Sequence, residues 1–122
     1  MNLQTVLERF SLIANVETDE SSPWIPICQE SIDEILAHIK PGINIEENSR
    51  RLEVAAASLA LYKYALYRAS NTAMESFTAG EIRVKTDPNT AVKMAYRAWR
   101  EAKSSIAELL EDNDFVFERI VF

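Results

Sequence analysis

The sequence holds one histidine and one cysteine, the side-chain types that most often act as a base or a nucleophile near neutral pH. His38 comes near the end of a predicted helix that Lys40-Pro41-Gly42 terminates, and no nucleophile motif surrounds it. We interpret it as a capping or solvated residue, because the helix dipole favours a cation at a helix C-terminus. Cys28 falls on the apolar stripe of the same helix, where burial raises the thiol pKa and makes the residue a small hydrophobe. Single copies of these residues exclude multi-histidine metal sites and an intrachain disulfide.

Carboxylates are the second set of residues whose type and spacing suggest chemistry. Glu30, Asp33 and Glu34 lie on one side of the helix that contains Cys28, away from its apolar stripe. Further acids that the magnesium cluster of an all-α nucleotide pyrophosphohydrolase would need are present at Glu46, Glu47, Glu108 and Glu111. Such a cluster requires acids that project inward from facing helices. Because these acids face away from the apolar stripes, we predict that they are solvated.

The strongest group of basic residues is a stripe on the last predicted helix. Lys93, Arg97 and Arg100 occupy positions i, i+4 and i+7, and Arg83 and Lys85 come shortly before that helix. Cations at this spacing share one helix face. The stripe is suited to contact phosphates or an acidic surface of another subunit, and it is equally typical of a solvated face.

Apolar residues at helical spacing predict four helices that would position these side chains. The second helix is expected to have Ser22 as its N-cap and Pro23 at its first position. The third is apolar on several sides, which predicts that it is central to the fold or shared with a partner chain. Alternating or β-branched residues predict two short strands near 81–85 and 115–121. The fold class is therefore mainly α, a single domain over 1–122 with a C-terminal strand tail, and its helices are expected at 3–14, 23–39, 46–69 and 88–110.

Length and charge restrict the classes of function. The 122 residues fit one domain, and 48% apolar with 26% charged residues is typical of a soluble globular chain. The net charge is -6, which argues against wrapping duplex DNA. The middle of the chain (48–103) holds ten bases and five acids, whereas 1–47 holds nine acids and two bases. Regions of opposite sign can attract each other within one chain or between copies. No signal peptide and no apolar run of about 18 residues is found, so neither secretion nor a membrane partner is expected.

The C-terminal tail is rich in large apolar side chains, although chain ends usually fray. Burying one aromatic side chain stabilises by about 1.5–3 kcal/mol, enough to hold a short tail against its own core or a neighbour. The tail strand is predicted to pair with the strand near 81–85 or to extend a sheet edge in the next copy. The candidate subunit or partner interface is therefore Ile82, Val84, Lys93, Arg97, Arg100, Phe115, Phe117, Ile120 and Phe122.

The order of these features resembles a known family. A helical pair precedes a long Ala- and Tyr-rich helix, which is followed by Phe77-Thr78-Ala79-Gly80-Glu81-Ile82-Arg83-Val84. An Ala-rich helix containing Trp99 and the ending Phe115-Val116-Phe117-Glu118-Arg119-Ile120 complete the chain. This layout is similar to the small head-tail connector (head completion or adaptor) proteins of tailed bacteriophages and prophages.

The resemblance implies a structural role rather than catalysis. Such proteins form a ring of identical subunits beneath the portal, extend the DNA exit channel and dock a tail or stopper protein. DNA would pass through without sequence-specific binding, and the family brings no catalytic residues, cofactor, metal or small-molecule substrate. The expected location is the virion, or the host bacterial cytoplasm during assembly. Two alternatives remain open at this point, a small acidic binding or regulatory module resembling an antitoxin, and the pyrophosphohydrolase-like enzyme considered above.

Overall fold

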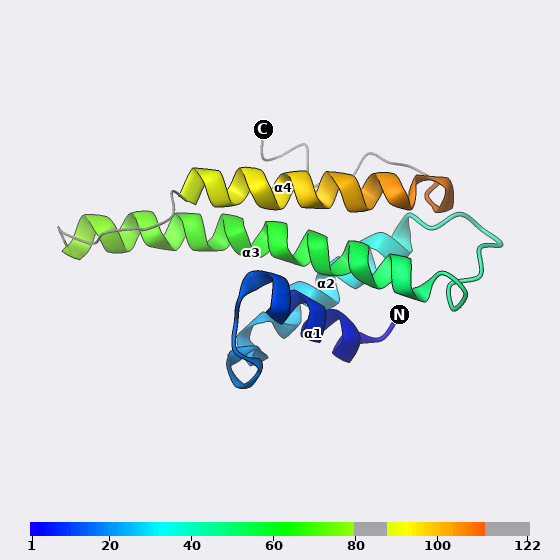
Figure 1. Cartoon of the computed structure of the whole chain (residues 1–122), viewed down its shortest axis with the longest axis horizontal. Helices are drawn as coiled ribbons and strands as arrows, with labels where there is room; N and C mark the ends of the chain where they lie inside the picture. The colour runs from blue at the N-terminus through cyan, green and yellow to red at the C-terminus, as the bar shows by residue number, and fades with distance from the viewer. Residues whose placement is uncertain (80–87, 112–122) are drawn as a thin grey trace.

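The computed structural model describes residues 1–79 and 88–111, with side chains described for 1–17, 19–70 and 89–111. This part of the chain is mainly helical, with four α-helices and no β-strand, which confirms the predicted helical class (Figure 1). Both predicted strands, near 81–85 and 115–121, lie outside the described residues. The α-helices are α1 (Leu3–Ala14), α2 (Ile25–Ala37), α3 (Ser49–Ala79) and α4 (Pro88–Ser105), and the 3-10 turns are η1 (Thr18–Glu20), η2 (Ser22–Trp24) and η3 (Ala107–Leu109).

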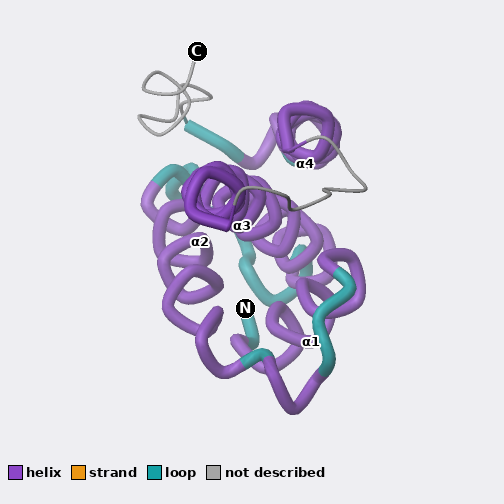
Figure 2. Tube along the Cα trace, turned by 90° about the vertical axis from the view of Figure 1, so that its left-hand side faces the viewer, coloured by secondary structure: helices purple, strands orange, loops and turns teal. Residues whose placement is uncertain are grey.

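The long helix α3 lies at the centre of the arrangement. It has 31 residues, about 46 Å at 1.5 Å per residue. In both views α4 lies on one side of α3, while α1 and α2 lie on the other side (Figures 1 and 2). α4 runs antiparallel to α3 along much of its length (Figure 1). The sequence left open whether this helix is central to the fold or shared with a partner chain, and the structure places it at the centre of the fold (Figures 1 and 2).

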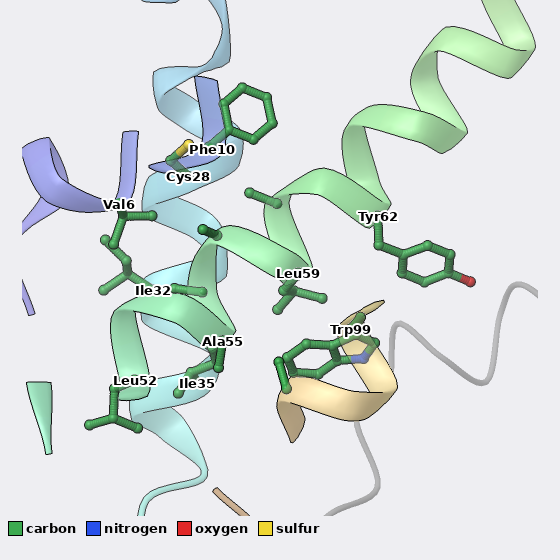
Figure 3. Close-up of a cluster of buried hydrophobic side chains, with 14 of the residues drawn as sticks. Val6, Phe10, Cys28, Ile32, Ile35, Leu52, Ala55, Leu59, Tyr62 and Trp99 are labelled. Carbon is green, nitrogen blue, oxygen red and sulfur yellow. The ribbon is translucent and has the colours of Figure 1, made fainter. Parts of the chain in front are cut away.

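The core lies on two sides of α3, where side chains of the other helices pack against it. Val6 of α1 and Cys28 of α2 lie on one side of α3, and Trp99 of α4 lies on the other (Figure 3). Small side chains let the neighbouring backbones approach, because α3 buries a run of alanines between its larger residues. Among the α3 residues whose side chains the structure describes (49–70), the completely buried ones are Leu52, Ala55, Ala56, Ala57, Leu59, Ala60 and Tyr62.

The first residues of α1 and α2 show how capping side chains and prolines set helix boundaries. α1 begins where expected, because the Asn2 side chain accepts hydrogen bonds from the backbone of Gln4 and Thr5. The predicted cap of the second helix is wrong. Ser22 lies inside the 3-10 turn η2, and α2 begins only at Ile25, without a side-chain cap. Each of the two prolines that follow Ser22 lacks an N–H, and the chain places each one in the first turn of its own helical segment.

α3 and α4 also differ from the predicted ranges. α3 begins at Ser49 because the Asn44 side chain accepts from the backbone N–H of Glu47 and closes a turn first. It continues to Ala79, since no proline or glycine interrupts the sequence before Gly80. α4 ends at Ser105 and is followed by the turn η3 instead of continuing to 110. Near the end of the described part, an isolated antiparallel bridge joins Leu110 to Ile39, which follows α2.

Candidate interaction site

The basic residues that the sequence singles out lie together on one side of α4. Lys93, Arg97 and Arg100 are all exposed, and we call these three residues the basic face. Their common orientation follows from the spacing, because positions i, i+4 and i+7 lie one above another on a helix. The rest of α4 is held against α3 by the buried side chains Val92, Ala95, Trp99 and Ala102. Packing of this apolar stripe therefore fixes the direction in which the basic face points.

Aromatic rings connect the basic face to the core. The Arg100 guanidinium lies 5.8 Å from the centroid of the Tyr96 ring, a distance at which cation and ring attract each other. Tyr96 in turn packs on buried Tyr62, with ring centroids 5.1 Å apart. A groove of about 630 Å³ runs over this side of α4, lined by Lys93, Tyr96, Arg97, Arg100, Glu101 and Ser104. The position of one of the three cations is thus set by the core.

The basic face forms no ion pair within the described part of the chain, although the exposed carboxylate of Glu101 lines the same groove. No ion pair joins Lys93, Arg97 or Arg100 to a described carboxylate. Exposed cations that form no ion pair can attract acidic groups or phosphates on a partner. The arrangement can therefore bind an anionic surface.

The carboxylates of α2 differ in part from the prediction that they are solvated. Glu30 and Glu34 were expected to be solvated, yet both accept hydrogen bonds from Lys63 of α3, at 2.8 and 2.9 Å. The Lys63 side chain is 6% exposed and that of Glu34 only 20%, whereas Glu30 remains 68% exposed. The prediction is therefore wrong for Glu34, because a lysine in the apolar stripe of α3 needs counter-charges from the facing helix. Asp33 is exposed, as expected.

This ion-pair cluster also bears on the magnesium site considered from the sequence. The two α2 carboxylates that approach α3 meet an ammonium group, not further carboxylates. Glu46 and Glu47 are exposed, and Glu108 pairs with Arg51 at 2.7 Å. The hydrogen bond from Arg51 lowers the pKa of the Glu108 carboxyl below its ordinary value. Among the described residues, no three His, Cys, Asp or Glu side chains gather where they could hold a metal ion.

The two potential catalytic side chains occupy the structural roles that we expected. Cys28 is completely buried, and this burial raises the pKa of its thiol to about 11. His38 is the C-cap residue of α2, and its Nδ1 lies 2.8 Å from the carbonyl oxygen of Glu34. Because a carbonyl only accepts, Nδ1 carries the proton in this contact. Both interpretations, a buried small hydrophobe and a capping histidine, are confirmed.

An aromatic cluster was not anticipated from the sequence. The rings of Trp24 and Tyr64 meet edge to face at a centroid distance of 4.8 Å, and Phe10 and Tyr67 pack against this pair. Tyr67 remains 51% exposed. The tyrosines of α3 were noted as part of its apolar cover, but the ring contacts depend on how η2 crosses that helix. No sequence spacing encodes that crossing.

The other predicted interface residues lie outside the described residues, namely Ile82, Val84, Phe115, Phe117, Ile120 and Phe122. No helix in the described ranges is long and apolar enough to cross a membrane. Comparisons of the chain with family models, with curated proteins and with solved structures find no match.

Proposed function

We propose that the chain is a structural head-tail connector subunit of a tailed bacteriophage or prophage. In this role, copies form a ring beneath the portal, extend the DNA exit channel and dock a tail or stopper protein. The proposal combines two supports. One is the order of helices and motifs that resembles this family, and the other is the basic face on α4.

The observation that carries the proposal is the basic face itself. Three exposed cations stand on one side of a helix whose other side is fixed to the core, and no described carboxylate pairs with them. Such a grouping also occurs on solvated faces, but an assembly subunit needs charge that points in a fixed direction. The Arg100 contact with Tyr96 supports this interpretation, because a cation held on a ring loses less freedom on binding.

The proposed ring also uses the chain segments at 81–85 and 115–121. We propose that they form two short strands whose apolar residues pack between subunits, with Ile82, Val84, Phe115, Phe117, Ile120 and Phe122 at the contact. Two isolated short strands are marginal in water, so packing against helices or a neighbouring copy would stabilise them.

The acidic surface fits a channel through which DNA slides. On α1 and α2 the acids Glu8, Glu30 and Asp33 are exposed, against the single arginine Arg9. A wall of this sign repels phosphates and so lets DNA pass without sequence-specific binding. The proposed location is the virion, or the bacterial cytoplasm during assembly.

The experiment mixes the purified chain with its cognate portal and follows both by sedimentation velocity, while phage or induced prophage particles are assayed for the chain by mass spectrometry. We expect the chain to sediment with the portal and to be present in the particle fraction. A strict monomer in the presence of the portal, together with particles that lack the chain, contradicts the proposal.

The same material distinguishes the alternatives. A regulatory module resembling an antitoxin would bind tightly to a basic protein encoded next to it and be missing from particles. An enzyme of the pyrophosphohydrolase kind would turn over nucleoside triphosphates with Mg²⁺ and lose that activity in Glu34→Gln.

A further inference from the structure

A second charged surface lies at the opposite end of the molecule from the basic face. The connection between α1 and α2 (residues 15–24) contains Glu17, Asp19 and Glu20, which are all exposed, and it contains no lysine or arginine. We call these three acids the acidic end. Figures 1 and 2 place this connection and α4 at opposite ends, with α3 between them.

The two surfaces cannot neutralise each other within one chain. A helix layer adds about 8–10 Å, so crossing from α4 over α3 to the α1–α2 layer covers about 20 Å. At an ionic strength of about 0.1 M the Debye length is roughly 10 Å, so charges at this separation are largely screened from each other. The basic face and the acidic end are therefore available for contacts between molecules.

We infer that the basic face of α4 binds the acidic end of a second copy of this chain. Three cations face three carboxylates, and guanidinium groups bind carboxylates in a two-pronged geometry. The contact joins different surfaces of the two copies, so it is heterologous, and each copy keeps one free surface of each kind. Repetition of such a contact produces a ring when the rotation closes. The inference deepens the proposed function and rests on it only for that closure.

Local structure prepares the acidic end for binding. The turn η1 holds the segment, with the backbone N–H of Glu20 donating to the carbonyl of Glu17 at 2.9 Å. The C-cap of α1 fixes its beginning, because Val16 N–H donates to the Ser11 carbonyl, also at 2.9 Å. Acids presented on an ordered segment lose less conformational entropy on association than acids on a free chain.

Exposed apolar side chains adjoin both surfaces. Leu12, 80% exposed, lies in the last turn of α1 and so precedes the acidic end in sequence, and Met94, 65% exposed, directly follows Lys93 of the basic face. Exposed ion pairs contribute little to binding on their own, so buried apolar area from neighbouring residues is needed to stabilise the contact. Both surfaces thus combine charge with an apolar contact, as expected for matching halves of one interface.

The experiment reverses each surface separately in the full-length chain. One variant carries Lys93→Glu, Arg97→Glu and Arg100→Glu, and the other carries Glu17→Lys, Asp19→Lys and Glu20→Lys. A matched control places the same charge change on exposed bases elsewhere, at Arg9, Lys40 and Arg50, each replaced by Glu. Sedimentation equilibrium at about 50 mM salt measures association, since screening is weak there, and circular dichroism verifies the fold.

We expect the wild type to associate at low salt and to dissociate as salt is added. Each reversed variant alone should bind itself roughly tenfold or more weakly than the wild type, because both of its surfaces then have the same sign. An equimolar mixture of the two variants should regain association, since every contact again joins opposite charges. The control should associate like the wild type.

Three results of the sedimentation experiment overturn the inference. They are a wild type that stays monomeric up to millimolar concentration, a mixture that associates no better than either variant, and a control that loses association equally. If the chain's own residues 112–122 cover the basic face in place of a second copy, the wild type stays monomeric, which is the first result. Association of the mixture without portal binding refutes the proposed function alone, whereas portal-bound rings that survive either reversal refute this inference alone.

Discussion

Replacing Lys63 by methionine tests whether the α2–α3 ion-pair cluster was interpreted correctly. Lys63 donates to Glu34 at 2.9 Å in a setting where the two side chains are 6% and 20% exposed. It also donates to Glu30 at 2.8 Å, but that carboxylate is 68% exposed. Methionine is one atom shorter than lysine and carries no charge, so the change keeps most of the apolar packing and leaves the two acids without their cation.

The magnitude follows from the burial of each pair. Loss of a hydrogen bond to a charged, largely buried partner costs about 1.5–3 kcal/mol, and loss of an exposed pair costs about 0.2–1 kcal/mol. We therefore expect Lys63→Met to lower the free energy of unfolding by about 2–4 kcal/mol. That is below the roughly 3–5 kcal/mol for breaking a fully buried pair, because one carboxylate stays in contact with water.

Urea unfolding followed by circular dichroism measures the loss. With a slope of about 2 kcal/mol per molar urea, the midpoint should fall by roughly 1–2 M. The matched control is Lys93→Met, which removes an exposed lysine without a described carboxylate partner and should change stability by less than about 0.5 kcal/mol. Adding Glu34→Leu to Lys63→Met should recover much of the loss, since apolar residues often replace a buried pair without cost.

Two results would refute the reasoning. The first is a Lys63→Met variant no less stable than Lys93→Met. The second is a double-mutant cycle in which Lys63 and Glu34 show no coupling, because residues in direct contact should couple by about 0.5–3 kcal/mol. In either case Lys63 would not depend on Glu34 in solution.

Two further predictions concern the core. Burial raises the pKa of Cys28 from 9.0 to about 11, so the protonated thiol stabilises the fold fully below pH 9, and this contribution is lost as the pH rises to about 11. The unfolding free energies of the wild type and Cys28→Ala should therefore converge between pH 9 and 11. Unfolding free energies that change in parallel with pH would contradict the burial of the thiol. Trp99→Ala should lower the free energy of unfolding by about 3–5 kcal/mol, because Trp99 of α4 is completely buried against α3. A loss below about 1 kcal/mol in urea titrations would mean that Trp99 does not hold α4 against α3.

The helices were predictable because their apolar stripes repeat at the helical period, and α1 was predicted with its true bounds. Boundaries were predicted wrongly where two local signals competed, as at Ser22, where two prolines three residues apart divided one expected helix into a 3-10 turn and α2. The C-terminal extension of α3 was missed because the stretch after Ala69 lacks a regular apolar pattern, although nothing in it stops a helix.

The candidate site was only partly predictable. The spacing of Lys93, Arg97 and Arg100 alone places them on one face, and α4 presents them so. The pairing of Lys63 with Glu34 depends on how α2 sits against α3, which no spacing along the chain encodes. The position of α4 and the 15–24 connection at opposite ends also depends on that packing, and it turns a difference of charge along the sequence into two separate surfaces (Figure 2).

The measurement that tests the central claim most directly is negative-stain imaging of the cognate portal with and without an excess of this chain. The account predicts added density in the form of a closed ring of subunits on one face of the portal, coaxial with its channel. Portal particles that look the same with and without the chain, at concentrations where binding partners would saturate, would contradict it.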